Sequence, residues 1–287
     1  MFNYSGLIKK AWKTAWKNKI LWLFGLFIAA GIESVSYRNY FDFDALQSQT
    51  LAFPEMPGGA SLIVTIIAVI IALVLFIISV ICQGSIIKGI HNTILKTENK
   101  FKPLWTYGVS RFWRVLGIEV LVGVAIIALV LPVLLLAVYV GEVLMMVFMV
   151  WLILILLAVV IFGSFFYYIL IYAVLEDKSV GTAISLAWKL YANNLKVSIL
   201  VSLINIGFSI AFAIGLMIAM IILMLPFVLI GLLFSMWLGA IGALITAILG
   251  AVVVFIFMLF YRGLLNTFLY SIGVFTFLEL KGKRVLS

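Results

Sequence analysis

Long apolar segments recur along this sequence, separated by short stretches that carry most of its charges. Four are clearly bounded, at residues 20–31, 62–84, 116–139 and 144–175, and a fifth runs from 197 to 261 without a charged residue. A membrane-spanning helix needs about 20 apolar residues. Every segment except the first is long enough. We expect residues 20–31 to gain length from their flanks, with Lys17 and Lys19 extending toward water.

Composition changes what the length alone would suggest. Of the 287 residues 67% are hydrophobic and 10% are charged, whereas a soluble domain has about 45–50% apolar and about 25% charged residues. This excludes a soluble globule, a disordered chain and a disulfide scaffold. Cys82 is the only cysteine and His91 the only histidine, so no Cys/His metal site can form and we expect no cofactor.

The basic residues indicate the orientation. Apart from Arg38, all of the 19 Lys and Arg lie before residue 20, between 84 and 115, between 176 and 196, or after 261. If the spans come in pairs, these stretches share one side of the membrane. The other side then carries Arg38 and the acidic residues Glu33, Asp42, Asp44, Glu55 and Glu142. Positively charged loops face the cytoplasm, so we expect both termini inside, in a multi-pass protein of the prokaryotic plasma membrane.

This orientation limits the number of spans in the longest segment. Lys196 and Arg262 must lie on the same side, and four spans would need about 80 residues where only 65 are present. Two spans leave a surplus near residues 226–237. The surplus either forms an interfacial or re-entrant outer connection or lengthens two tilted helices. We therefore predict an all-α membrane domain over 1–287 with six spans in three hairpins.

The start of the chain has a second interpretation, as a cleaved signal peptide. The apolar length fits, but the preceding basic region is long and contains Trp12 and Trp16, as a membrane-surface anchor would. We therefore expect the segment to be retained as the first membrane span rather than cleaved.

Two pairs of similar segments suggest an internal repeat. Ala11-Trp12-Lys13 before Asn18 matches Ala187-Trp188-Lys189 before Asn194, and KGIHNTIL at 88–95 matches RGLLNTFL at 262–269. A third copy of the repeat, with weaker similarity, begins with Trp105 and Arg111. We predict parallel repeats at 7–98, 103–178 and 182–271, each a surface helix followed by a hairpin. Alternatively, surface helices share Trp and Lys for physical reasons alone.

The first surface helix separates its side chains by type. At about 100° per residue, Leu7, Ile8, Ala11, Trp12, Ala15 and Trp16 share one arc, and Lys9, Lys10, Lys13, Thr14 and Lys17 share the other. A helix in the headgroup layer has this pattern and attracts anionic lipid. Nucleic acid is the rival partner, but a tethered helix meets lipid phosphate first. The predicted surface-anchoring residues are Trp12, Trp16, Lys9, Lys13, Lys17, Trp105 and Trp188.

Residues 172–190, YAVLEDKSVGTAISLAWKL, place a short acidic turn between a span and an Ala/Ser/Trp-bearing helix. This arrangement resembles the membrane domain of glycerophosphoryl diester phosphodiesterases and related six-span prokaryotic proteins of unknown function. The resemblance covers most of the chain, but its motifs are structural. In that family a separate soluble barrel carries the catalysis, and this sequence contains no such barrel, so the resemblance implies no catalytic residue here.

Few polar side chains fall within the apolar segments. Glu119 marks either a proton or substrate pathway or, more commonly, a carboxylate that reaches the interface or pairs with Arg114. Ser198, Ser202, Asn205 and Ser209 lie along one side of the fifth span. That side either packs by interhelical hydrogen bonds, which we favour, or lines a wetted path.

Together these patterns favour a non-catalytic membrane protein that organises lipids or partner proteins, including further copies of itself. A small permease or channel with a polar path along the fifth span is the alternative. An intramembrane enzyme has least support, because no catalytic motif is present.

The orientation can be tested with single cysteines, Ser48→Cys and Ser110→Cys, introduced separately into a Cys82→Ala background. An impermeant thiol reagent applied to intact cells should label position 48 and leave position 110 unlabelled, because the charge distribution places them on opposite sides. The reverse pattern would overturn the topology.

Overall fold

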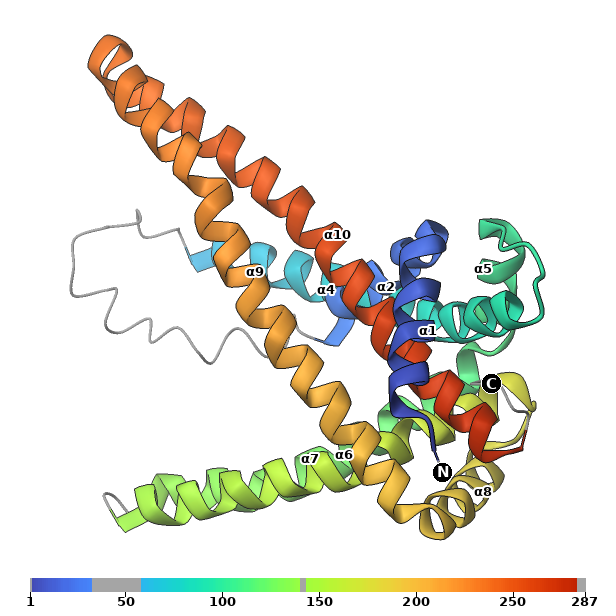
Figure 1. Ribbon diagram of the computed structural model, residues 1–287. Helices are drawn as coiled ribbons and strands as arrows, with labels where there is room; N and C mark the ends of the chain where they lie inside the picture. Colours follow the sequence, from blue (N-terminus) through green and yellow to red (C-terminus); the bar gives the residue numbers. More distant parts are fainter. Residues whose placement is uncertain (1, 33–57, 140–142, 283–287) are drawn as a thin grey trace.

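The computed structural model describes residues 2–32, 58–139 and 143–282, and within these ranges it contains helices and no strand. The predicted all-α fold is confirmed for this part of the chain (Figure 1). The helices are α1 (Tyr4–Lys17), α2 (Lys19–Ile32), α4 (Gly58–Ile94), α5 (Phe101–Ser110), α6 (Phe112–Tyr139), α7 (Val143–Leu175), α8 (Val180–Asn193), α9 (Leu195–Leu238) and α10 (Ala240–Leu280). The outer acidic segment and Glu142, on which part of the orientation argument depends, lie outside the described residues.

Three described helices are long and apolar enough to cross a membrane: Thr65–Ile94 within α4, all of α9, and all of α10. Lys19–Ile28 and Val160–Leu175 are shorter apolar helices. The chain is therefore compatible with a membrane protein. Helices α2, α4, α6 and α7 cover the first four predicted segments, and α9 and α10 divide the fifth, while the number of six spans remains a prediction.

The connection between α9 and α10 is a tight turn rather than an apolar loop. Pro226 lies inside α9, which continues to Leu238, and α10 begins at Ala240. The expected interfacial or re-entrant connection at 226–237 is therefore wrong, and the alternative of two lengthened helices is correct. Strongly apolar residues on both sides of Pro226 continue the helix, as is common where proline occurs in membrane helices. Gly239 alone, with φ +59° and ψ −145°, reverses the chain.

The described helices follow one order three times: a short helix, a one-residue break, a second helix, and a long helix. The second helix is long in two of the three cases (α6 and α9) and has 14 residues in the other (α2). We call α1, α2 and α4 unit 1, α5–α7 unit 2, and α8–α10 unit 3; the breaks fall at Asn18, Arg111 and Asn194. Asn18 donates its side-chain amide to Thr14 O at 2.9 Å, and Asn194 donates to Leu190 O at 3.0 Å. These bonds satisfy carbonyls that helix ends leave open. The order is what parallel repeats would produce, and their common origin remains a prediction.

The three units pack in a closed ring. The short helix of each unit lies on the returning helix of the unit before it: α5 on α4, α8 on α7, and α1 on α10. The second helix of each unit follows the same rule, with α6 on α4, α9 on α7, and α2 on α10. The short helices gather at one end, which we call the base, and the long helices diverge from it (Figure 1).

The core lies at the base, where the last part of α10 is enclosed by α1, α2, α4 and α7. Almost every side chain from Thr267 to Leu278 is buried, while the distal part of the α9–α10 hairpin exposes Leu, Ile, Phe and Met side chains. Exposed apolar surface of this extent is typical of helices that contact lipid.

We expect Gly239→Ala to destabilise the hairpin by at least about 1 kcal/mol, because its backbone angles lie in a region that only glycine adopts readily. The matched control is Gly207→Ala in α9, where an added Cβ has no neighbour within 4 Å. That change should be neutral or stabilising by about 0.5–1 kcal/mol. Thermal unfolding in detergent measures both, and equal effects would contradict the turn assignment.

Candidate functional site

The short helices use equivalent positions to face the protein. We number positions from the break residue of each unit. Positions −3 and −7 are buried in every unit, and position −11 is also buried in units 1 and 3. Most of these residues are small, which lets the short helix approach the returning helix closely. They are Leu7, Ala11 and Ala15 in α1, Leu104 and Gly108 in α5, and Ala183, Ala187 and Tyr191 in α8.

A tryptophan stands six residues before each break. Trp12 is 43% exposed and Trp188 is 51% exposed, while Trp105 is half-buried. Trp12 packs edge-on against Phe268 of α10, with ring centroids 5.7 Å apart, and Trp188 packs in the same manner against Phe165 of α7 at 5.8 Å. Each of these two indoles therefore has one side on a returning helix and the other side exposed, as an interfacial tryptophan has.

The predicted apolar arc of α1 is divided in the structure. Leu7, Ala11 and Ala15 are completely buried against the protein, and only Trp12 and Trp16 remain substantially exposed, stacked on each other with ring centroids 5.8 Å apart. The placement of Thr14 on the polar arc is wrong, since it is 7% exposed. The cause is α10, which covers this side of α1.

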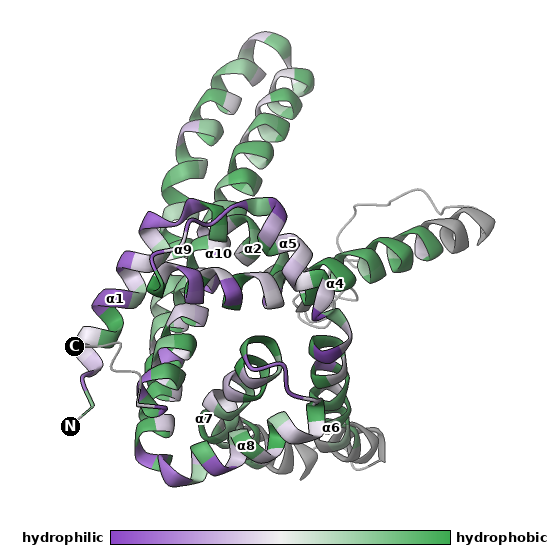
Figure 2. Cartoon of the chain, turned by 90° about the vertical axis from the view of Figure 1, so that its right-hand side faces the viewer, coloured by the Kyte–Doolittle hydropathy of each residue, from purple (hydrophilic) through white to green (hydrophobic). Residues whose placement is uncertain are grey.

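The lysines of the short helices point away from the protein. Lys9, Lys13, Lys17, Lys102 and Lys189 are exposed. Figure 2, which faces the base, shows the most hydrophilic residues on these helices and their connections, with the apolar hairpins behind. The base therefore presents cations beside partly exposed indoles. Their action as membrane anchors remains a prediction.

The acidic turn between α7 and α8 ties the base together. Asp177 accepts hydrogen bonds from Arg111 and Arg114, and Glu176 pairs with Lys281 beyond α10. Close by, the Tyr107 hydroxyl donates to Val174 O at 2.6 Å. Both acids of this turn are thereby neutralised by local cations, so they do not offset the exposed lysines of α1.

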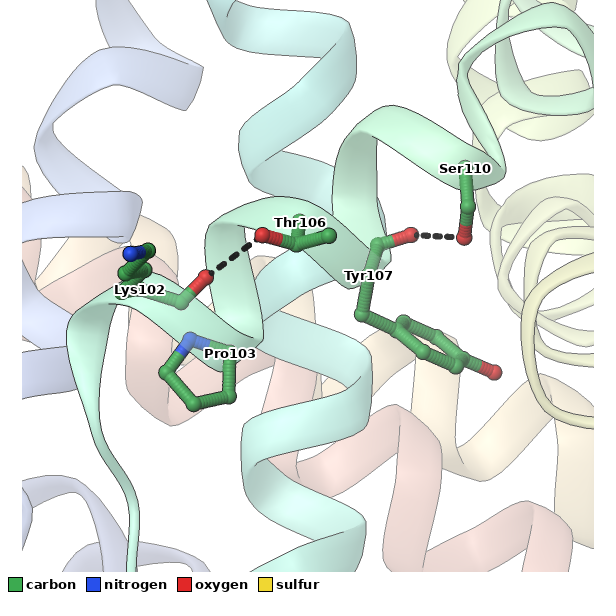
Figure 3. Close-up of a pocket in the computed structure, with 5 residues that line it drawn as sticks. All are labelled: Lys102, Pro103, Thr106, Tyr107 and Ser110. Carbon is green, nitrogen blue, oxygen red and sulfur yellow. Dashed lines mark hydrogen bonds between the residues drawn. The ribbon is translucent and has the colours of Figure 1, made fainter.

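A shallow depression on α5 does not form a ligand cavity. Its lining residues, Lys102, Pro103, Thr106, Tyr107 and Ser110, all come from one helix (Figure 3). The hydroxyls of Thr106 and Ser110 donate to carbonyls of the same helix, at 3.0 and 2.7 Å. With no opposing wall and these donors already used, the depression cannot enclose a small molecule.

Glu119 of α6 faces the side chain of Gln83 where α6 contacts α4. The suggested pairing of Glu119 with Arg114 is wrong, because Arg114 points to Asp177. Gln83 is 1% exposed, and one oxygen of each side chain is buried with no hydrogen-bond partner among the described residues. This pair therefore joins units 1 and 2 while leaving two acceptors unsatisfied.

The polar residues along one side of α9 are Ser198, Ser202, Asn205 and Ser209, and the first two contact α7. Ser164 of α7 donates its backbone N–H to Ser202 Oγ at 2.9 Å, and its hydroxyl donates to Ser198 O at 2.8 Å. Ser209 instead donates to Asn205 O of its own helix at 2.8 Å. Asn205 is 9% exposed, and its Oδ1 has no partner in the described part of the chain. The first two serines thus make the interhelical bonds that the packing interpretation requires.

Each interface between units contains at least one polar contact: Glu119 faces Gln83 between units 1 and 2, and the bonds of Ser164 to α9 join units 2 and 3. The third joins units 3 and 1, where Asn266 donates its side-chain amide to Gly25 O at 2.8 Å. On the second helix of each unit, one residue takes part in this contact: Gly25 in α2, Glu119 in α6 and Ser202 in α9. Each stands seven or eight places after the break. Sequence reasoning did not identify Ser164 or the roles of Gln83 and Asn266, although Asn266 lies in the repeated segment 262–269.

No group of three His, Cys, Asp or Glu side chains that could hold a metal ion occurs among the described residues. Comparison with known proteins gave no matching family model, no similar curated protein and no similar solved structure.

Ser202→Ala should lower the free energy of unfolding by about 1 kcal/mol, because it removes an acceptor used by α7 in a membrane-type contact. Ser209→Ala, the same change on the same helix, removes only a bond within α9 and should cost much less. Unfolding in mixed detergent micelles measures both. Similar losses in the two variants would show that the α7 contact contributes nothing specific.

Proposed function

We propose that this chain is a non-catalytic integral membrane protein that organises anionic lipids at the cytoplasmic face of a prokaryotic cell membrane, directly or for partner proteins. The observation that carries the proposal is the base, where exposed lysines and half-exposed tryptophans of three short helices surround the origin of three apolar hairpins. Anionic headgroups attract such lysines, and indoles prefer the interface next to them.

The full topology belongs to this proposal: six spans, with both termini inside. The short helices and the last residues of α10 lie together at the base (Figure 1). The short helices contain six of the 16 described Lys and Arg residues, and most of the others lie in the connections and helix ends next to them. A single cationic end from which all hairpins depart agrees with the positive-inside rule. The net charge of +9 would then act largely on one leaflet.

A small permease or channel is the second candidate. In its favour, Glu119, Gln83 and Asn205 each hold a buried oxygen without a partner among the described residues, and polar groups within membrane helices often mark solute pathways. Against it, Ser198 and Ser202 are bonded to α7, which interrupts the polar path expected along α9. Lipid organisation is therefore the better supported function.

The proposal predicts a charge-dependent selectivity for lipid. In vesicles containing the full-length protein, spin-labelled phosphatidylglycerol should associate with the protein more strongly than spin-labelled phosphatidylcholine. Replacing Lys9, Lys13 and Lys17 together with Gln should reduce this preference, since each lysine near an anionic surface contributes about 1 kcal/mol.

The control is ionic strength, because raising the salt concentration should weaken the preference of the wild-type protein and have less effect on the triple variant. A wild-type protein with no preference for the anionic lipid would contradict the proposed function.

A further inference from the structure

A pocket of about 320 Å³ lies where α1 turns into α2, beside α10. It is lined by Trp16, Lys19, Trp22, Leu23, Leu26 and Phe260. Unlike the depression on α5, it has walls from helices far apart in sequence, because Phe260 of α10 faces residues of α1 and α2. It therefore satisfies the first requirement of a binding site, a concave surface that the fold itself builds.

The lining residues change in character along the pocket. Lys19 is exposed at the start of α2, Trp22 follows one turn later, and Leu26 stands another turn further. At 1.5 Å per residue, Lys19 and Leu26 are separated by about 10 Å along the helix axis. A cation, two indoles and then apolar side chains thus succeed one another over the distance that separates the phosphate of a phospholipid from the upper part of its acyl chains.

The two indoles are held in different ways. Trp22 donates its Nε1–H to Ala15 O at 2.6 Å, which fixes its ring across the break between α1 and α2. Trp16 is 55% exposed, and its ring centroid lies 5.7 Å from that of Trp22 at an interplanar angle of 59°. One wall of the pocket is therefore rigid, and the other presents an indole of the kind found at the glycerol level of membranes.

The fold does not require these residues. Relative to the break, Trp16, Lys19 and Trp22 correspond to Val109, Phe112 and Val115 in unit 2 and to Ala192, Leu195 and Ser198 in unit 3. The same helix junction is thus made twice in this molecule without a cation or an indole at those places. Contacts of Gly25 with Gly263 and Asn266 attach α2 to α10 separately. Packing alone leaves the cation and the two indoles unexplained.

We propose that this pocket binds one anionic phospholipid of the membrane. The Lys19 ammonium pairs with the phosphate, Trp16 and Trp22 enclose the glycerol region, and Leu23, Leu26 and Phe260 contact an acyl chain. Leu23 and Phe260 are 44% and 53% exposed, which leaves apolar surface available for that chain. The inference rests on the proposed function and makes it specific, since it separates one bound lipid from the general attraction of the base.

Native mass spectrometry of the full chain in mild detergent tests the site. Phosphatidylglycerol and phosphatidylcholine are added in turn, and the lipids retained per chain are counted as their concentration rises. The wild-type protein should retain one phosphatidylglycerol more tightly than any other lipid. Lys19→Gln should weaken that first binding event about fivefold, as the loss of one lysine next to an anionic headgroup implies.

Lys196→Gln is the matched control, because Lys196 is also exposed and stands at the start of α9, as Lys19 stands at the start of α2, but does not line the pocket. It should leave the first binding event unchanged. Leu23→Trp, which fills the acyl part of the pocket from an exposed position, should weaken binding of the first lipid while thermal stability is kept. Because Leu23→Trp changes no charge, weaker binding in this variant cannot result from a general loss of attraction between lysines and anionic lipid.

The outcomes separate the two proposals. Equal weakening by Lys196→Gln and Lys19→Gln, with the preference for phosphatidylglycerol intact, would overturn the pocket and leave the proposed function standing. A first lipid that binds equally as phosphatidylcholine would overturn the assignment of Lys19 to a phosphate of an anionic lipid. Loss of any preference for phosphatidylglycerol in the wild-type protein would overturn both.

Discussion

The ring of helices depends on a backbone contact between α2 and α10. A Cβ on Gly25 would lie 2.5 Å from Gly263 O, and one on Gly263 would lie 2.5 Å from Trp22 O, so neither position has room for a side chain. Units 1 and 2, and units 2 and 3, are joined by short connections of the chain, which keep them close. Units 3 and 1 have no such connection. Their interface must hold by contact alone, and close glycine packing with the Asn266 hydrogen bond is how it does so.

Once the ring is closed, its charges fall into two groups with different consequences. The arginines at the start of unit 2 and Lys281 face the acidic turn and are used within the protein. Lys9, Lys13 and Lys17 of α1 are exposed on a helix whose small residues are buried, so their charges face the surroundings of the chain. The same amphipathic helix thereby packs through its alanines and presents its lysines to the surroundings, with the tryptophans between them at the boundary. We propose that these lysines meet anionic headgroups.

Much of the helical architecture follows from the sequence, because runs of apolar residues bounded by charges leave little choice of element. The break at Asn18 and the tryptophan six residues before it are visible as a motif. What the sequence does not reveal is the partner of an apolar or polar side chain. Lipid and protein select the same residues, so Ala11 and Ala15 look identical whether they face a bilayer or α10. For the same reason the sequence offers Arg114, five residues away, as one partner for Glu119, whereas the side chain that Glu119 faces, Gln83, comes from unit 1.

The unequal lengths of the hairpins have a consequence for the surrounding bilayer. Helix α9 has 44 residues and is about 66 Å long, while α2 has 14 residues and is about 21 Å long. A hydrocarbon core of about 30 Å cannot match both when they stand upright. A helix that is too long must tilt or project, and one that is too short must thin the bilayer or take length from its flanks. In the proposed six-span topology, the divergence of the long helices from one base would let α9 and α10 tilt while α2 stands upright, so that bilayer thickness and the angle between the helices would be linked.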